Sequence, residues 1–97
     1  MSLAIAWTPE AKETFEHTVN LIESKWGLKS AEKFVRSAHK TINNIAAHPY
    51  IFKGSFAQDT RQAFITRQTS MFYEVHTSYI LILFFWITGR SQLPTNF

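Results

Sequence analysis

Apolar side chains recur at helical spacing in two successive segments of the chain. In the first, Ala11, Phe15, Val19, Ile22 and Trp26 follow one another at spacings of four, four, three and four residues. All five therefore share one face of a helix. The second segment has a stripe of the same kind, formed by Ala31, Phe34, Val35, Ala38, Ile42, Ile45 and Ala46. The pattern predicts two amphipathic helices, near residues 9–26 and 30–48.

Residues at the ends of these stripes indicate where the helices begin and end. Thr8 precedes Pro9, which places threonine at a helix N-cap and proline at the first helical position. Gly27 is typical of a helix C-terminus. Ser30 is expected to cap the second helix, which ends before His48. Since only three or four residues separate the two helices, we expect an antiparallel helical hairpin.

Segments with β-strand character flank the two helices. Leu3–Trp7 is a short apolar segment that precedes the first helix. After the second helix, Arg61–Arg67 and Met71–His76 are β-prone, with Gln68-Thr69-Ser70 as the turn between them. The run Tyr79–Ile87 is apolar throughout, which predicts a central strand covered on both faces.

The predicted order of elements is β-α-α-β-β-β. We expect the helical hairpin to pack on one face of a four-stranded, mostly antiparallel sheet, which is an α+β fold. A length of 97 residues with 45% hydrophobic and 18% charged residues fits a folded chain with a single domain over residues 1–97. Residues 50–60 have no period and are predicted to form a surface loop.

Composition excludes several kinds of site. The chain has no cysteine, so a disulfide framework, thiolate catalysis and metal sites built on sulfur are excluded. The four histidines do not have the spacing of a helical metal site, and the sequence lacks a glycine-rich phosphate loop and a nucleophile elbow. We therefore expect neither a metal nor another cofactor.

Hydropathy bears on where the protein acts. The strongest apolar run has eight residues, whereas a membrane-spanning helix needs about twenty. No basic stretch followed by an apolar segment opens the chain, so a signal peptide is not expected. These features favour a cytoplasmic protein without membrane contact.

Cations and a hydroxyl in the C-terminal half are the candidate functional groups. They are Lys53, Arg61, Arg67, Tyr73 and Arg90. Arg61 and Arg90 fall at predicted strand ends, where planar guanidinium groups could converge on one phosphate or acidic surface. The alternative is that each arginine is solvated or pairs with Glu74 or a helix carboxylate. Tyr73 alternates with apolar neighbours, which predicts a ring in the core and a hydroxyl at the rim.

A pattern of arginine, strand, Tyr-x-Val, strand and arginine runs through the same half of the chain. Its segments, with two from the first half, are Trp7-Thr8-Pro9-Glu10-Ala11, His48-Pro49, Arg61–Ile65, Phe72–Val75, Ile80–Leu83 and Gly89-Arg90. Over nearly the whole chain this pattern resembles the RelE/ParE superfamily, the toxins of type II toxin–antitoxin systems. The resemblance implies a toxin, of a kind associated with plasmid stabilisation, that a cognate antitoxin neutralises. It also implies that operator DNA is contacted only through the antitoxin.

The resemblance implies two alternative activities. RelE-like members cut messenger RNA in the ribosomal A site with basic residues and usually a tyrosine, whereas ParE-like members poison DNA gyrase without a defined hydrolytic centre. Arg61 and Arg90 keep two of the five RelE-like catalytic positions. The other three are occupied by Ala63, Ser70, and Asn96 or Phe97. Since arginine is a poor base, Tyr73 or His76 would have to accept the 2′ proton.

We therefore expect a toxin that acts on translation or on DNA gyrase, and the lost positions disfavour a ribosome-dependent endoribonuclease. The candidate catalytic residues are Arg61, Arg90 and Tyr73, and the candidate contacts to substrate or antitoxin are Lys53, Arg61, Arg67 and Arg90. A non-toxic orphan interaction module of the same fold is the alternative. A free-standing nucleic-acid-binding domain is disfavoured, because ten Lys and Arg nearly balance seven Asp and Glu and leave a net charge of +3.

Overall fold

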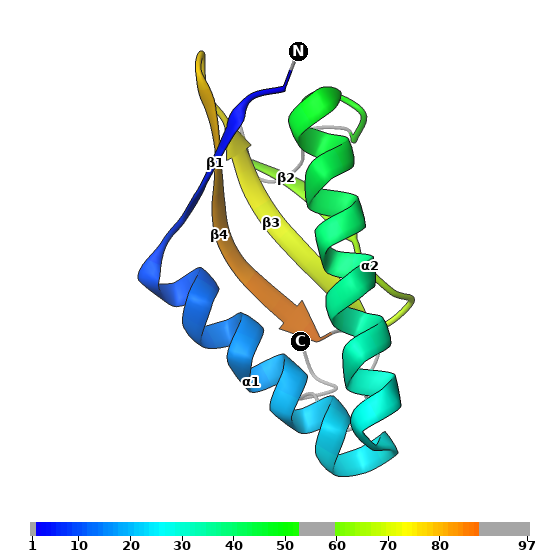
Figure 1. Cartoon of the computed structure of the whole chain (residues 1–97). Helices are drawn as coiled ribbons and strands as arrows, with labels where there is room; N and C mark the ends of the chain where they lie inside the picture. Colours follow the sequence, from blue (N-terminus) through cyan, green and yellow to red (C-terminus); the bar gives the residue numbers. More distant parts are fainter. Residues whose placement is uncertain (1, 53–59, 88–97) are drawn as a thin grey trace, which may run out of the picture.

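The computed structural model describes residues 2–52 and 60–87, in which two helices pack against one face of a four-stranded sheet (Figure 1). In chain order the elements are β1 (Ala4–Trp7), α1 (Pro9–Trp26), α2 (Leu28–Ala47), β2 (Thr60–Phe64), β3 (Thr69–Val75) and β4 (Tyr79–Ile87). The strand order is β1-β4-β3-β2. β1 is parallel to β4, and the other neighbours are antiparallel. The predicted fold class, order of elements and helix-covered face are confirmed.

A single glycine joins the two helices. Thr8 caps α1 as predicted, since its hydroxyl accepts a hydrogen bond from the Ala11 N–H at 2.9 Å. Gly27 has a φ of 97°, a left-handed conformation that other residues rarely adopt. Its N–H closes α1 on Glu23, and its carbonyl accepts from Ala31 in the first turn of α2. α2 therefore begins at Leu28, and the prediction of Ser30 as its cap was wrong.

The turn between β2 and β3 also differs from the prediction. β2 ends at Phe64 and β3 begins at Thr69, so residues 65–68 form the turn in place of Gln68-Thr69-Ser70. Thr69 and Ser70 are buried because they pair with the last residues of β4. Their polar composition indicated a turn, but pairing with the central strand keeps them in the sheet.

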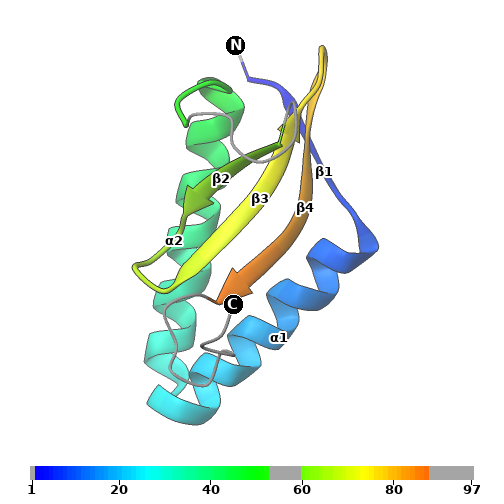
Figure 2. The same cartoon turned by 180° about the vertical axis from the view of Figure 1, so that it is seen from behind.

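β4 is a central strand, as predicted, and within residues 2–52 and 60–87 the helices cover only one of its faces. Ile80, Ile82 and Phe85 face the helices and are buried. Trp86 points the other way and is 43% exposed, and no helix of the described residues covers that face (Figure 2). Among the described residues, the predicted cover on both faces is therefore found on the helix side alone, because both helices pack on the same face of the sheet.

A one-residue bulge in β4 decides which aromatic ring enters the core. Leu83 has no partner in β3, and the register shifts there by one residue. Because strand side chains alternate, this extra residue moves the inward-facing position from Phe84 to Phe85. Phe85 therefore packs against Trp7 and Phe15, with ring centroids 5.6 and 5.0 Å away.

Threonine hydroxyls of the α1 segment pair with β4 where β1 stops. β1 accompanies β4 only as far as Ile82. Beyond that point the Thr8 hydroxyl donates to the Leu83 carbonyl at 2.7 Å, and the Phe85 N–H donates to the Thr14 hydroxyl at 2.9 Å. These two bonds fix α1 to the central strand at the bulge.

Thr14→Val is expected to lower the free energy of unfolding by about 1–2 kcal/mol. Valine keeps the shape of threonine but leaves the Phe85 N–H without its acceptor, and an unpaired buried donor is destabilising by about this amount. Urea unfolding measures the change. Thr41→Val in α2 is the matched control, because Thr41 is half-buried and its hydroxyl bonds to no described residue. Equal losses in the two variants would contradict the expectation.

Candidate functional site

Arg61 lies on the helix-facing side of the edge strand β2. Its Nη1 donates a hydrogen bond of 2.6 Å to the Phe52 carbonyl, and its guanidinium carbon lies 4.8 Å from the centre of the Tyr50 ring. Among the described residues no carboxylate pairs with it. Since Tyr50 and Phe52 follow the end of α2, Arg61 joins that segment to the sheet through a charge-assisted bond and a cation–π contact.

Tyr73 lies opposite Arg61 in the β2–β3 ladder. The residue is 0% exposed, and neither its hydroxyl nor the Arg61 Nε has a hydrogen-bond partner among the described residues. The predicted hydroxyl at the rim was wrong, because β3 is an inner strand and the helices cover this face. Burial raises the pKa of Tyr73 to about 12, although the Arg61 cation opposes the rise. The hydroxyl is therefore protonated at neutral pH and is a poor general base.

An imidazole–carboxylate pair lies on the other face of the sheet. His76 Nε2 is 2.9 Å from Glu74 Oε1, and the His76 ring stacks on Tyr79 with centroids 4.6 Å apart. Glu74 follows Tyr73 in β3, so the two side chains point to opposite faces. Arg61 and His76 are thereby separated by the sheet and do not form one catalytic centre.

The other predicted cations are not brought next to Arg61. Arg67 is exposed in the turn between β2 and β3, beyond the end of β2, in which Arg61 is the second residue. Lys53 and Arg90 lie outside the described residues. The last residue of β4, Ile87, pairs with Thr69, which lies four residues before Tyr73 in β3, about 13 Å away.

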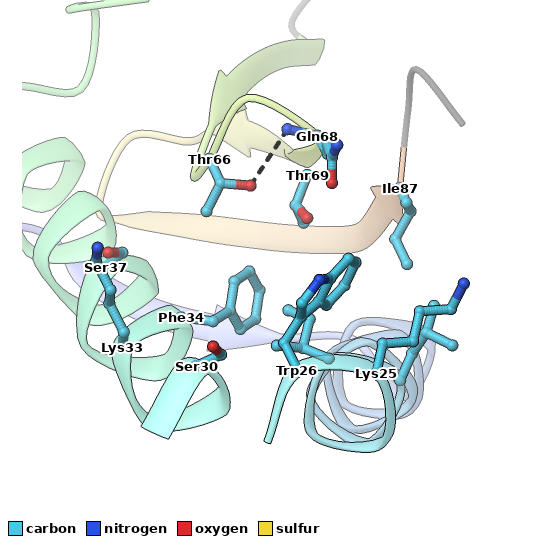
Figure 3. Close-up of a pocket in the computed structure, with 12 residues that line it drawn as sticks. Lys25, Trp26, Ser30, Lys33, Phe34, Ser37, Thr66, Gln68, Thr69 and Ile87 are labelled. Atoms are coloured by element: carbon cyan, nitrogen blue, oxygen red, sulfur yellow. Dashed lines mark hydrogen bonds between the residues drawn. The ribbon is translucent and has the colours of Figure 1, made fainter. Parts of the chain in front are cut away.

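A pocket of about 290 Å³ opens near the start of α2 (Figure 3). The end of α1, the first half of α2, the β2–β3 turn and the end of β4 line it. Figure 3 shows the rings of Phe34 and Trp26 between Lys33 on one side and Lys25 on the other. The pocket is apolar at its centre and cationic at its edges.

The pocket is separate from the cluster that Arg61 forms with Tyr50 and Phe52. Tyr50 and Phe52 follow the C-terminal end of α2, whereas the pocket lies at its N-terminal half. A helix of this length extends about 30 Å. This pocket is therefore remote from Arg61 and its partners.

Sequence reasoning missed the partners of Arg61 and the pocket. Tyr50 and Phe52 are aromatic residues in a segment otherwise typical of a loop, and that was the available signal. Trp26 was counted with the core stripe of α1, yet it is 55% exposed. Its position at the last residue of the helix, next to Lys25, indicated a surface role.

The described part of the chain has neither a metal centre nor a membrane helix. Within residues 2–52 and 60–87, no three His, Asp or Glu side chains come together in a way that could hold a metal ion. In the same residues, neither α1 nor α2 combines the length and the apolarity needed to cross a membrane.

Tyr73→Phe is expected to reduce the loss of stability at alkaline pH. The folded-state pKa of about 12 lies above the ordinary value of 10.0, so the unfolded chain releases the proton first. The stability that the protonated Tyr73 hydroxyl contributes is fully present below pH 10 and is lost as pH rises toward 12. The free energy of unfolding then falls with a slope approaching about 1.4 kcal/mol per pH unit. Urea unfolding at neutral pH and above pH 10 measures it. The same alkaline slope in both proteins would contradict the burial of this hydroxyl.

Comparison with protein families gives one match over most of the chain. Residues 5–92 match the family described as the ParE toxin of the type II toxin–antitoxin system parDE. Among curated protein sequences, none matches the chain significantly.

Three solved structures illustrate the likeness in fold. The chromosomal ParDE system of P. aeruginosa gives a TM-score of 0.75 at 18% identity and covers 90% of this chain and 97% of that one. The YoeB dimer of Staphylococcus aureus gives 0.65 at 14% identity, with 93% and 100% covered. YafQ of E. coli strain BL21(DE3) gives 0.53 at 13% identity, with 88% and 92% covered. At these identities the likeness is one of fold.

Proposed function

Since the chain belongs to the ParE toxin family of type II toxin–antitoxin systems, we propose that it arrests bacterial growth by acting on DNA gyrase. A cognate antitoxin neutralises it, and both act in the cytoplasm. Ribosome-dependent cleavage of messenger RNA is the competing activity, because the resemblance to the RelE/ParE superfamily implies it as the alternative.

The separation of acid–base groups from cations supports the gyrase-directed activity. Cleavage of RNA through its 2′-hydroxyl needs a base and a stabilising cation at one phosphate. Tyr73 is buried and protonated beside Arg61, and His76 lies on the other face of the sheet. Neither of the two bases that the sequence indicated, Tyr73 and His76, is therefore available beside Arg61, which favours a toxin that acts by binding.

Two assays on the same protein distinguish the activities. Purified protein is incubated with gyrase and supercoiled DNA, and primer extension is run on messenger RNA after induction in cells. We expect gyrase-dependent DNA cleavage and no new messenger RNA ends. New ends at ribosome-bound codons, with gyrase unaffected, would overturn the proposal in favour of the nuclease.

The candidate site residues enter the proposal as contacts to the target. Arg67 is exposed in the β2–β3 turn, and Arg61 is a partly buried cation of the edge strand that also contacts Phe52 and Tyr50. Lys53 and Arg90, outside the described residues, complete the proposed set of cations. Tyr73 is not proposed as a contact to the target, because it is buried. It supports the position of Arg61, which lies opposite it in the sheet.

The pocket in Figure 3 supports a docking place for the antitoxin. Its aromatic centre suits the apolar side of an amphipathic segment, and Lys25 and Lys33 suit acidic side chains of the same segment. Such segments are commonly disordered until they bind. Recognition of operator DNA is then a property of the antitoxin.

Expression in a bacterium separates the toxin from a non-toxic interaction module of the same fold. We expect growth arrest when the chain is expressed alone and recovery when the adjacent open reading frame is expressed with it. Harmless expression of soluble, folded protein would favour the non-toxic module.

A further inference from the structure

Charge is distributed unevenly between the two helices. α1 contains four glutamates and two lysines, whereas α2 contains the cations Lys29, Lys33, Arg36 and Lys40 and one carboxylate, Glu32. Four cations less one carboxylate give α2 a charge of +3, which equals the net charge of the whole chain. The near balance of charges over the sequence therefore conceals a strongly basic helix.

The four cations form one stripe along the outer face of α2. Their spacings of four, three and four residues align them over about 16 Å of helix. The buried side chains Phe34, Ala38 and Ile42 lie on the opposite side. All four cations are exposed, and none forms an ion pair with another described residue.

This arrangement is not one that stabilises the helix. Like charges three and four residues apart repel each other and are mildly destabilising. A helix face that only keeps a protein in solution commonly mixes the two signs. A stripe of four unpaired cations is instead the footprint of a surface that binds an extended anion.

The side chains along the stripe favour a phosphate backbone over a protein. No large apolar side chain is exposed between residues 29 and 40, and the exposed Trp26 and Leu28 lie only at its N-terminal end, whereas the centre of a protein interface is apolar or aromatic. A shallow hollow beside Arg36 and Lys40 is also lined by Val35, His39, Asn43 and Asn44. Lysine, arginine and asparagine are typical donors to phosphate oxygens.

We infer that the outer face of α2 binds the phosphate backbone of duplex DNA without reading its sequence. Single strands are disfavoured because their binding relies on exposed aromatic rings for base stacking, and the stripe has none. The inference depends on charge and geometry and not on the proposed target. It concerns backbone contact only, so recognition of an operator sequence stays with the antitoxin.

Fluorescence anisotropy with the purified chain and a labelled duplex of mixed sequence tests the inference. Binding should weaken as KCl rises, with log K falling against log salt at a slope of up to about −3.6 for four phosphate contacts. Lys40→Gln should reduce the magnitude of that slope by about 0.9, and Arg36→Gln with Lys40→Gln by about 1.8. These residues are exposed, so circular dichroism should report unchanged folding.

Lys12→Gln is the matched control, because it removes one exposed cation from α1. It should leave the slope unchanged. Equal effects of Lys12→Gln and Lys40→Gln would overturn the inference, since attraction would then follow net charge alone. Tighter binding of a single strand, an RNA duplex or polyglutamate than of the DNA duplex would also overturn it. The assay contains no gyrase, so its outcome is independent of the growth-arrest and gyrase experiments.

Discussion

Phe85→Ala is expected to lower the free energy of unfolding by about 3–5 kcal/mol, a large fraction of the roughly 5–15 kcal/mol that stabilises a typical domain. Phe85 is 3% exposed, and its ring lies between those of Trp7 and Phe15. Truncation removes both ring contacts and leaves a cavity where α1 meets β4. Urea unfolding followed by near-ultraviolet circular dichroism measures the loss.

Phe84→Ala provides the control within the same dipeptide. Phe84 lies on the face without helices, is half-buried, and stacks on Phe72 with ring centroids 4.8 Å apart. Its truncation should lower the free energy of unfolding by about 1–2 kcal/mol, the contribution of one aromatic pair and partial burial. Equal losses for the two variants, or a larger loss for Phe84→Ala, would contradict the bulge at Leu83.

Elements whose signals are local could be predicted from the sequence. α1 begins and ends at Pro9 and Trp26 as expected, because Thr8-Pro9 and Gly27 determine its ends whatever it packs on. β4 begins and ends at Tyr79 and Ile87, because polar residues flank the continuous apolar run on both sides. Backbone preference and hydropathy suffice for such elements.

Features that depend on contacts between distant segments could not be predicted. The bulge at Leu83 occurs where β1 ends and hydroxyls from α1 bond to the strand in its place. Thr69 is a strand residue because Ile87 lies opposite it. Neither pairing leaves a trace in the residues near it in the sequence, so alternation and turn composition indicated a different register.

For the candidate site, too, the sequence indicated a residue but not the contacts that this residue makes. Arg61 was a candidate because it falls at the end of a predicted strand, and it does lie at the start of β2. Its environment could not be predicted, since Tyr50 and Phe52 return to the sheet after α2 by a path that no local pattern specifies. The cationic stripe of α2 was visible in the spacing of Lys29, Lys33, Arg36 and Lys40, but a count of charges over the whole chain obscured it.

Arg61→Ala is expected to lower the free energy of unfolding by about 2 kcal/mol, and toxicity should fall with it. The change removes the charge-assisted bond to the Phe52 carbonyl and the stacking on Tyr50, which together contribute about this amount. For a domain of this size, each kcal/mol corresponds to about 4–8 °C in melting temperature. A thermal melt and a growth assay on the same variant measure both effects.

Arg67→Ala distinguishes a structural arginine from one that contacts the target. Arg67 is exposed in the β2–β3 turn, so its removal should change the free energy of unfolding by less than about 0.5 kcal/mol. Lost toxicity in Arg67→Ala with an unchanged melting temperature would therefore identify a contact to the target. Arg61→Lys should lie between Arg61→Ala and the parent chain in stability, because lysine keeps the charge but not the planar stacking. If Arg61→Ala instead loses toxicity without any fall in melting temperature, the bond to Phe52 contributes little to the fold, and the Arg61 guanidinium acts on the target.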